Sequence, residues 1–174
     1  GGYEFYEPFQ NGFTNLKFDI RNKMLISYSG LLIEEENLSL KIKVSVRYFN
    51  IPNSPFAGLA RIVTVTNLGA KKRNFELLDG LPQIIPFGTN NFFLKEMSRI
   101  IEAWMSVENL EKNVPYFKLA TDPSDRPEVV HIREGNFYLG FNFNANNKVK
   151  IIKPIINPCS IFGTATDFSC PRNF

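Results

Sequence analysis

The chain has 174 residues, of which 44% are hydrophobic and 21% are charged, and this balance excludes a disordered protein. The net charge of +3 is small and dispersed, so the sequence predicts neither nucleic acid nor an anionic membrane surface as a partner. No apolar run approaches the ~18 residues of a transmembrane helix, and the N-terminus lacks the pattern of a signal peptide.

The first half of the chain shows the alternation of apolar and polar residues that is typical of half-buried strands. Strands are predicted at residues 16–20, 24–28, 40–48, 59–66 and 73–78. The first two would form a hairpin around a turn at 21–23, and a second turn is predicted at 67–69. The run Glu34-Glu35-Glu36 is interpreted as a solvated turn between strands.

The second half contains one segment with a helical period. Apolar residues recur there at intervals of three and four, at Phe93, Met97, Ile100, Ile101, Trp104, Val107 and Leu110. This period predicts one amphipathic helix near residues 92–112. Further strands are predicted at 128–133, 137–143 and 148–152, with a turn at 144–147. The fold class is therefore mainly β, an antiparallel β-sandwich with one main helix, in a single domain over 1–174 that ends in a tail or linker at 155–174.

A search for catalytic chemistry finds little. His131 is the only histidine, and we expect it to be packed or hydrogen-bonded in the middle of an apolar strand. The two cysteines, Cys159 and Cys170, are too few for a closed zinc site, and they are interpreted as reduced thiols of a cytoplasmic protein. Phosphate-binding glycine loops and the nucleophile elbow of hydrolases are missing from the sequence. We therefore predict no catalytic residue, no metal and no cofactor.

Four residues are candidates for carbohydrate binding, because sugar rings stack on aromatic faces and glycoside chemistry uses carboxylates. They are Tyr3, Tyr6, Asp79 and Trp104. Two of them have a competing structural interpretation. Asp79 lies in a loop stiffened by Gly80 and Pro82 and could instead close an Asx-turn, and Trp104 falls on the apolar stripe of the predicted helix and could belong to the core.

Three apolar segments are expected to expose surface that another domain would cover. They are residues 3–13, 81–87 and 155–168. Solitary soluble domains rarely leave large contiguous apolar patches uncovered.

The segment 59–69, followed by 73–82, resembles a strand-turn-strand in the N-terminal sandwich of the cellobiose-phosphorylase-like family of glycoside phosphorylases. Residues 96–105 are similar to a helical insertion found in long members of that family. Residues 135–141 and 161–167 are similar to later stretches of the same proteins. Together these segments span much of residues 24–167.

The resemblance implies a β-supersandwich related to the galactose-mutarotase-like fold. In this family the sandwich precedes an (α/α)6 barrel that carries the catalytic acid, where inorganic phosphate attacks the anomeric carbon with inversion. Nothing in the sequence matches the barrel, so no catalytic or phosphate-binding residue is carried over.

The function implied is that of a non-catalytic N-terminal accessory domain, with the barrel of the same parent chain beyond Phe174. Such a domain would pack on the barrel, shape the substrate entrance and assist dimerisation, so the partners implied are the barrel, a carbohydrate and a second copy. One alternative is a stand-alone carbohydrate-binding module. Another is a mutarotase-like enzyme, which would have only His131 for its proton transfer.

Overall fold

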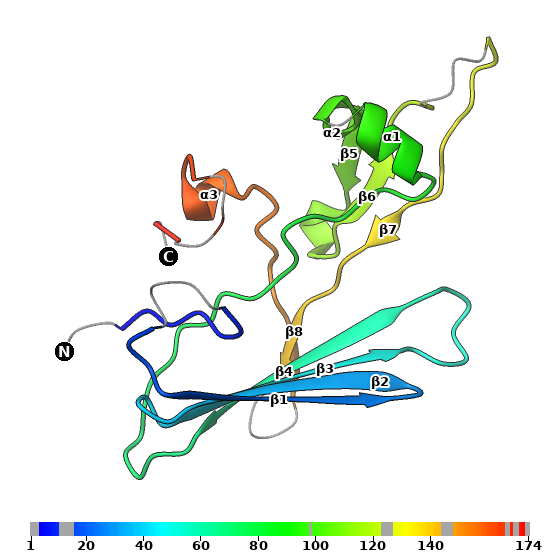
Figure 1. Ribbon diagram of the computed structural model, residues 1–174. Coiled ribbons are helices and arrows are strands. Elements are labelled where there is room, and N and C mark those ends of the chain that lie inside the picture. The colour runs from blue at the N-terminus through cyan, green and yellow to red at the C-terminus, as the bar shows by residue number, and fades with distance from the viewer. Residues whose placement is uncertain are drawn as a thin grey trace. The chain divides into compact units, whose positions relative to one another are not determined.

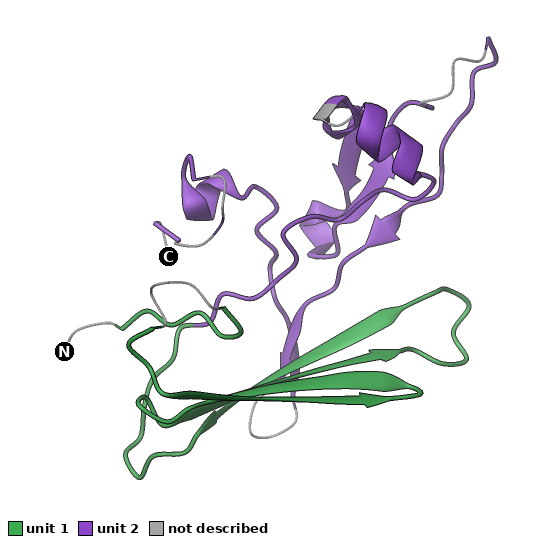
Figure 2. Cartoon of the chain, in the orientation of Figure 1, with its two compact units in different colours: residues 1–76 green, residues 77–174 purple. Residues whose placement is uncertain are grey.

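The computed structural model describes residues 4–10, 16–97, 99–122, 127–143, 148–165, 168 and 171–172. The chain divides into two compact units, Gly1–Glu76 and Leu77–Phe174 (Figure 2). The prediction of a single domain over 1–174 stays a prediction.

The first unit is built on a four-stranded antiparallel sheet. Its strands are β1 (Ile20–Ser27), β2 (Gly30–Asn37), β3 (Ile42–Asn50) and β4 (Leu59–Asn67), and they lie in the order β1-β2-β3-β4 (Figure 1). The strands predicted at 40–48 and 59–66 are confirmed as β3 and β4, and so is the antiparallel, β-rich character of the fold.

The register sorts side chains onto two different faces, because residues that lie directly opposite each other share a face of the sheet. What we call the apolar face carries Met24, Ile26, Leu31, Ile33, Ile42, Val44, Val46, Val63 and Val65, together with Glu35 and Asn37. The other face, which we call the charged face, carries Arg21, Lys23, Glu34, Glu36, Lys43, Ser45, Arg47, Thr64 and Thr66. The core of the unit lies on the apolar face, where Ile42, Val44 and Val46 are buried.

The predicted hairpin turn at 21–23 is wrong, because these residues lie inside β1 and the turn is made by Tyr28 and Ser29. The interpretation of Glu34–Glu36 as a solvated turn is also wrong, because the run lies inside β2. The register explains both corrections. Lys23 lies opposite Glu34 and Arg21 opposite Glu36, so residues that look like turn signals are paired charges on neighbouring strands.

The second unit contains short elements. Its helices are α1 (Asn91–Glu96), α2 (Arg99–Trp104) and α3 (Cys159–Phe162), and a 3-10 turn, η2, spans Leu110–Lys112. One sheet has the order β5-β6-β7, from β5 (Met105–Glu108), β6 (Tyr116–Leu119) and β7 (Asn136–Phe137). A separate hairpin joins β8 (Phe141–Phe143) to β9 (Val149–Ile151).

The single helix predicted near 92–112 is replaced by two short helices and a strand. The side chain of Asn90 caps α1 by accepting a hydrogen bond from the Phe93 amide at 2.9 Å. The helical segment ends at Trp104, and β5 then pairs with β6 in register. The helical period of the sequence is local, whereas β6 offers a ladder of backbone hydrogen bonds, and this tertiary pairing overrides the period after Trp104.

The remaining strand predictions have mixed outcomes. Segments 73–78 and 128–133 are irregular, because no described strand pairs with either of them. Segment 137–143 is interrupted between β7 and β8, and the strand predicted at 148–152 is confirmed as β9. The turn predicted at 144–147 lies outside the described residues.

Gly30 begins β2 at a point where the backbone of β3 approaches closely. A Cβ atom at Gly30 would lie 2.7 Å from the carbonyl oxygen of Tyr48, whereas a Cβ at Gly80 would meet nothing within 4 Å. We predict that Gly30→Ala lowers the free energy of unfolding by about 1–3 kcal/mol, because the β2–β3 ladder must shift to accommodate the methyl group. The matched change Gly80→Ala should leave it unchanged or raise it by up to about 1 kcal/mol. Urea melts compare the two, and equal midpoints would contradict the close approach.

Candidate functional site

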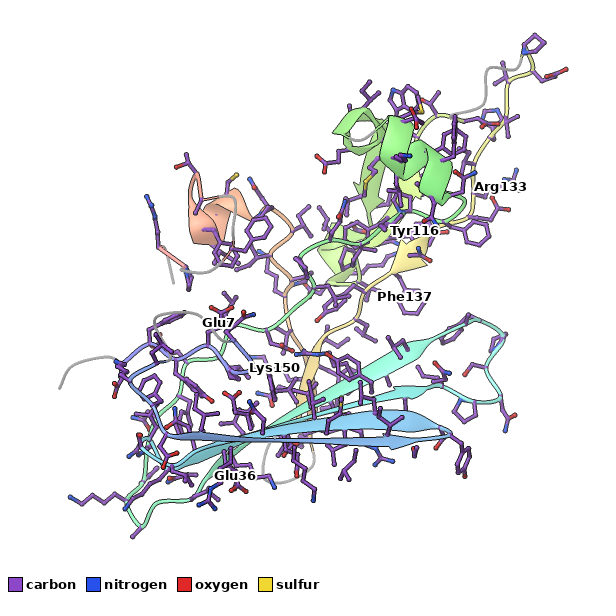
Figure 3. All side chains as sticks on the ribbon, viewed as in Figure 1. Glu7, Glu36, Tyr116, Arg133, Phe137 and Lys150 are labelled. Atoms are coloured by element: carbon purple, nitrogen blue, oxygen red, sulfur yellow. The ribbon has the colours of Figure 1, made fainter. Side chains whose placement is uncertain are left out.

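The three consecutive glutamates of β2 divide between the two faces of the sheet. Glu34 and Glu36 lie on the charged face, where Lys43 Nζ approaches Glu34 Oε1 at 2.9 Å and Glu36 Oε1 at 3.7 Å. The hydrogen bond from Lys43 lowers the pKa of Glu34 below its usual value, and the same bond raises the pKa of Lys43. Figure 3 shows Glu36 on the side of the sheet that faces away from segment 4–10.

Glu35 points the other way and is 1% exposed. The Tyr6 hydroxyl donates a hydrogen bond to one of its carboxylate oxygens, and the Phe9 amide donates to the other at 3.0 Å. Phe9 has a left-handed backbone, with φ of 62°, which is uncommon for a residue with a side chain. A buried carboxylate needs such hydrogen bonds, because leaving it unpaired in an apolar environment is costly.

These contacts place segment 4–10 over part of the apolar face (Figure 1). Tyr6 and Phe9 pack against the buried side chains of Ile42, Val44 and Val46. The Tyr6 ring also meets the Phe18 ring edge to face, with the ring centroids 5.6 Å apart. Burial, followed by the hydrogen bond and the charge of Glu35, raises the pKa of Tyr6 above its usual value, so its hydroxyl remains a donor at neutral pH.

Both Glu35 oxygens are occupied and the residue is closed to solvent. Such a side chain is out of reach of a substrate, because catalysis by a carboxyl group requires hydrogen-bond reach to the reacting group. Its chemical role is therefore to hold segment 4–10 on the sheet. Nearby, the buried Asn37 accepts a hydrogen bond from the Leu40 amide at 2.8 Å and so shapes the turn from β2 into β3.

The candidate carbohydrate-binding residues occupy different environments. Tyr3 lies outside the described residues. Tyr6 is half-buried and engaged with Glu35 and Phe18 in the first unit. In the second unit, Asp79 is exposed on an irregular segment, and Trp104 is half-buried at the end of α2, where its carbonyl accepts a hydrogen bond from the Ala120 amide at 2.7 Å. Their assignment to sugar binding stays a prediction.

Of the other candidate residues, the structure describes His131 and Cys159, and both are exposed. His131 is exposed and lies on an irregular segment, so the expectation that it packs within a strand is wrong. Cys159 is an exposed free thiol, and Cys170 lies outside the described residues. Over the described ranges, no group of three or more His, Cys, Asp or Glu could hold a metal ion. No helix in that part of the chain has the length and apolarity needed to cross a membrane.

Comparison with protein-family models, with curated proteins and with solved structures finds no match to this chain.

Sequence reasoning missed Glu35, the residue that joins the N-terminal segment to the sheet. The signal was available in the alternation from Gly30 to Asn37. Leu31, Ile33 and Glu35 are separated by steps of two and share the apolar face. Three adjacent acidic residues were interpreted as one exposed unit, whereas the pleat of a strand places the middle residue on the face opposite to its neighbours.

The Tyr6–Glu35 hydrogen bond should have a measurable effect on stability. Tyr6→Phe removes the hydroxyl but keeps the ring, and it leaves one oxygen of a buried carboxylate without its donor. We predict a loss of about 1–3 kcal/mol in the free energy of unfolding. The matched change Tyr28→Phe affects a fully exposed side chain, 104% accessible, and should stay within about 0.5 kcal/mol of the parent. Urea melts that rank the two variants equally would refute the role of this bond.

Proposed function

We propose that this chain is a non-catalytic accessory domain of a carbohydrate-active enzyme that resembles the cellobiose-phosphorylase-like family. In this proposal the first unit belongs to an N-terminal β-supersandwich of the galactose-mutarotase-like type. Its apolar face packs against the catalytic (α/α)6 barrel of the same cytoplasmic parent chain. The domain helps to shape the substrate entrance and assists dimerisation, while the barrel performs the chemistry. Two observations support this proposal. Segments within residues 24–167 resemble that family, and part of the apolar face of the sheet is uncovered.

The observation that carries the proposal is an uncovered part of the apolar face. Segment 4–10 covers the end of this face near Ile42, whereas the end near the β1–β2 turn is open. Met24 is 64% exposed, Ile26 is 77% exposed and Leu59 is 67% exposed. A sheet with one apolar face buries that face against a second layer in a stable domain. A large exposed apolar surface marks an interaction site.

The three apolar segments singled out in the sequence support the same proposal. Exposed large hydrophobic side chains occur in each of them, at Phe5, at Leu81, Ile85 and Phe87, and at Ile155 and Ile156. The expectation that at least one of these segments is exposed is confirmed. Contacts between domains of one chain bury about 600–1,500 Å². Exposed apolar side chains such as these could form part of a contact of that size.

The first test concerns activity and sugar binding of the isolated chain. We predict that it releases no glucose 1-phosphate from cellobiose and inorganic phosphate, because the catalytic groups belong to the barrel. Calorimetric titration with cellobiose should show no heat of binding. Binding that disappears in Trp104→Ala, while the urea midpoint stays at the parent value, would favour the stand-alone carbohydrate-binding module instead.

The second test concerns the apolar face in the parent protein. The gene should encode an (α/α)6 barrel on the same reading frame. In that enzyme, the double change Met24→Lys and Ile26→Lys places two charges on the open part of the apolar face and should lower the melting temperature and the phosphorolysis rate. The double change Leu25→Lys and Ser27→Lys puts the same two charges on the charged face of β1 and should change neither. A reading frame without a barrel, or equal effects of the two changes, would overturn the proposal.

A further inference from the structure

The outer edge of β4 is the feature that goes furthest beyond this proposal. β4 pairs with β3 on one side, and among the described strands none pairs with its other side. Two hydrogen bonds fix which backbone groups face β3, Ile51 N to Gly58 O at 2.9 Å and Leu68 N to Lys41 O at 2.8 Å. In an antiparallel ladder the direction of these groups alternates along the strand. The even-numbered residues of β4 therefore bond to β3, and the odd-numbered residues from Leu59 to Asn67 direct their backbone groups outward.

This edge has only one of the devices that usually prevent strand pairing, a charged residue on the apolar face. β4 contains neither proline nor lysine, and its register with β3 is continuous over the whole strand, without a bulge. That charged residue is Arg61, which lies opposite Tyr48 on the apolar face and whose Nε donates to the Tyr48 hydroxyl at 3.0 Å. The opposite edge of the same sheet, β1, carries Arg21 and Lys23. Of the two edges, β4 is the one suited to adding a strand.

We propose that two copies of this chain pair through β4, antiparallel, about a two-fold axis at Val63. Outward-facing residues must meet outward-facing residues if both backbones are to bond, so odd positions lie opposite odd positions. The register with complete overlap then sets Val63 opposite Val63 of the second copy. The inference rests on the dimerisation role within the proposed function, and it depends on neither the barrel nor the sugar.

The side chains of β4 suit a second copy in this register. Arg61 lies opposite Val65, so no two like charges face each other, and on the charged face Ile62 lies opposite Thr64. A two-fold axis perpendicular to the sheet keeps the apolar faces of both copies on the same side. Val63, which packs beside the core of each unit, would then lie against Val63 of the other copy on the apolar side of the seam, with an Arg61–Val65 pair on either side of it. β-branched pairs of this kind are favourable cross-strand neighbours.

Light scattering coupled to gel filtration tests the pairing on the 174-residue chain, whose mass is 19.9 kDa. As the protein concentration is raised to about 1 mM, the chain should form a dimer of about twice that mass. The double variant Ile62→Lys, Thr64→Lys sets lysines against lysines across the seam and should elute as a monomer. The double variant Ile62→Glu, Thr64→Glu should do the same. An equimolar mixture of the two should regain the dimer mass, because Lys and Glu then alternate across the seam.

A matched control carries the same charges on the other edge. Leu25→Lys, Ser27→Lys lies on the charged face of β1 and should leave the dimer intact. A parent chain that stays monomeric up to about 1 mM would overturn the inference, as would a dimer that survives both β4 variants or one that only the β1 control dissociates. Positions 62 and 64 lie on the charged face, away from Met24 and Ile26, so failure of this pairing and failure of barrel docking are read from different variants.

Discussion

The alternation of side chains across the pleat of β2 and β3 is the constraint on which the first unit depends. It places Ile42, Val44 and Val46 on one face and Lys43 and Ser45 on the other. The same alternation separates three adjacent glutamates, so that two of them bind Lys43 on the charged face while the third is buried on the apolar face. A shift of one residue in the register would exchange every side chain between the faces, so the apolar face and the charge pairs specify the register together.

Burial of Glu35 links the sheet to a segment that is distant in the sequence. Its two oxygens are satisfied by the hydroxyl of Tyr6 and the amide of Phe9, both neutral groups. Because removing one donor would leave a desolvated carboxylate unpaired, segment 4–10 is held on the sheet by more than the packing of its rings. This attachment covers only the end of the apolar face near Ile42, and it leaves Met24 and Ile26 open at the other end.

The sheet therefore offers two surfaces of different chemistry. Burying the apolar side chains of the open part of the apolar face is favourable, and a second layer such as a barrel could cover them. The β4 edge presents backbone donors and acceptors that could form hydrogen bonds with another strand. The two uses are compatible, because pairing at the edge leaves both apolar faces on the same side. A dimer formed in this way would carry two docking faces on one continuous sheet.

The sequence by itself determined that the chain is rich in antiparallel strands, and it located β3 by its period of two and β4 by its β-branched residues. The tertiary structure alone decided the rest. It placed Arg21 and Lys23 inside a strand by setting Glu36 and Glu34 opposite them, and it turned Met105–Glu108 from a helical pattern into β5 by supplying β6 as a partner. It also buried Glu35, because Tyr6 and Phe9 arrive from a segment that no local pattern connects to β2. Local periods report which face a residue occupies, whereas the partner that covers that face is chosen by contacts between distant parts of the chain.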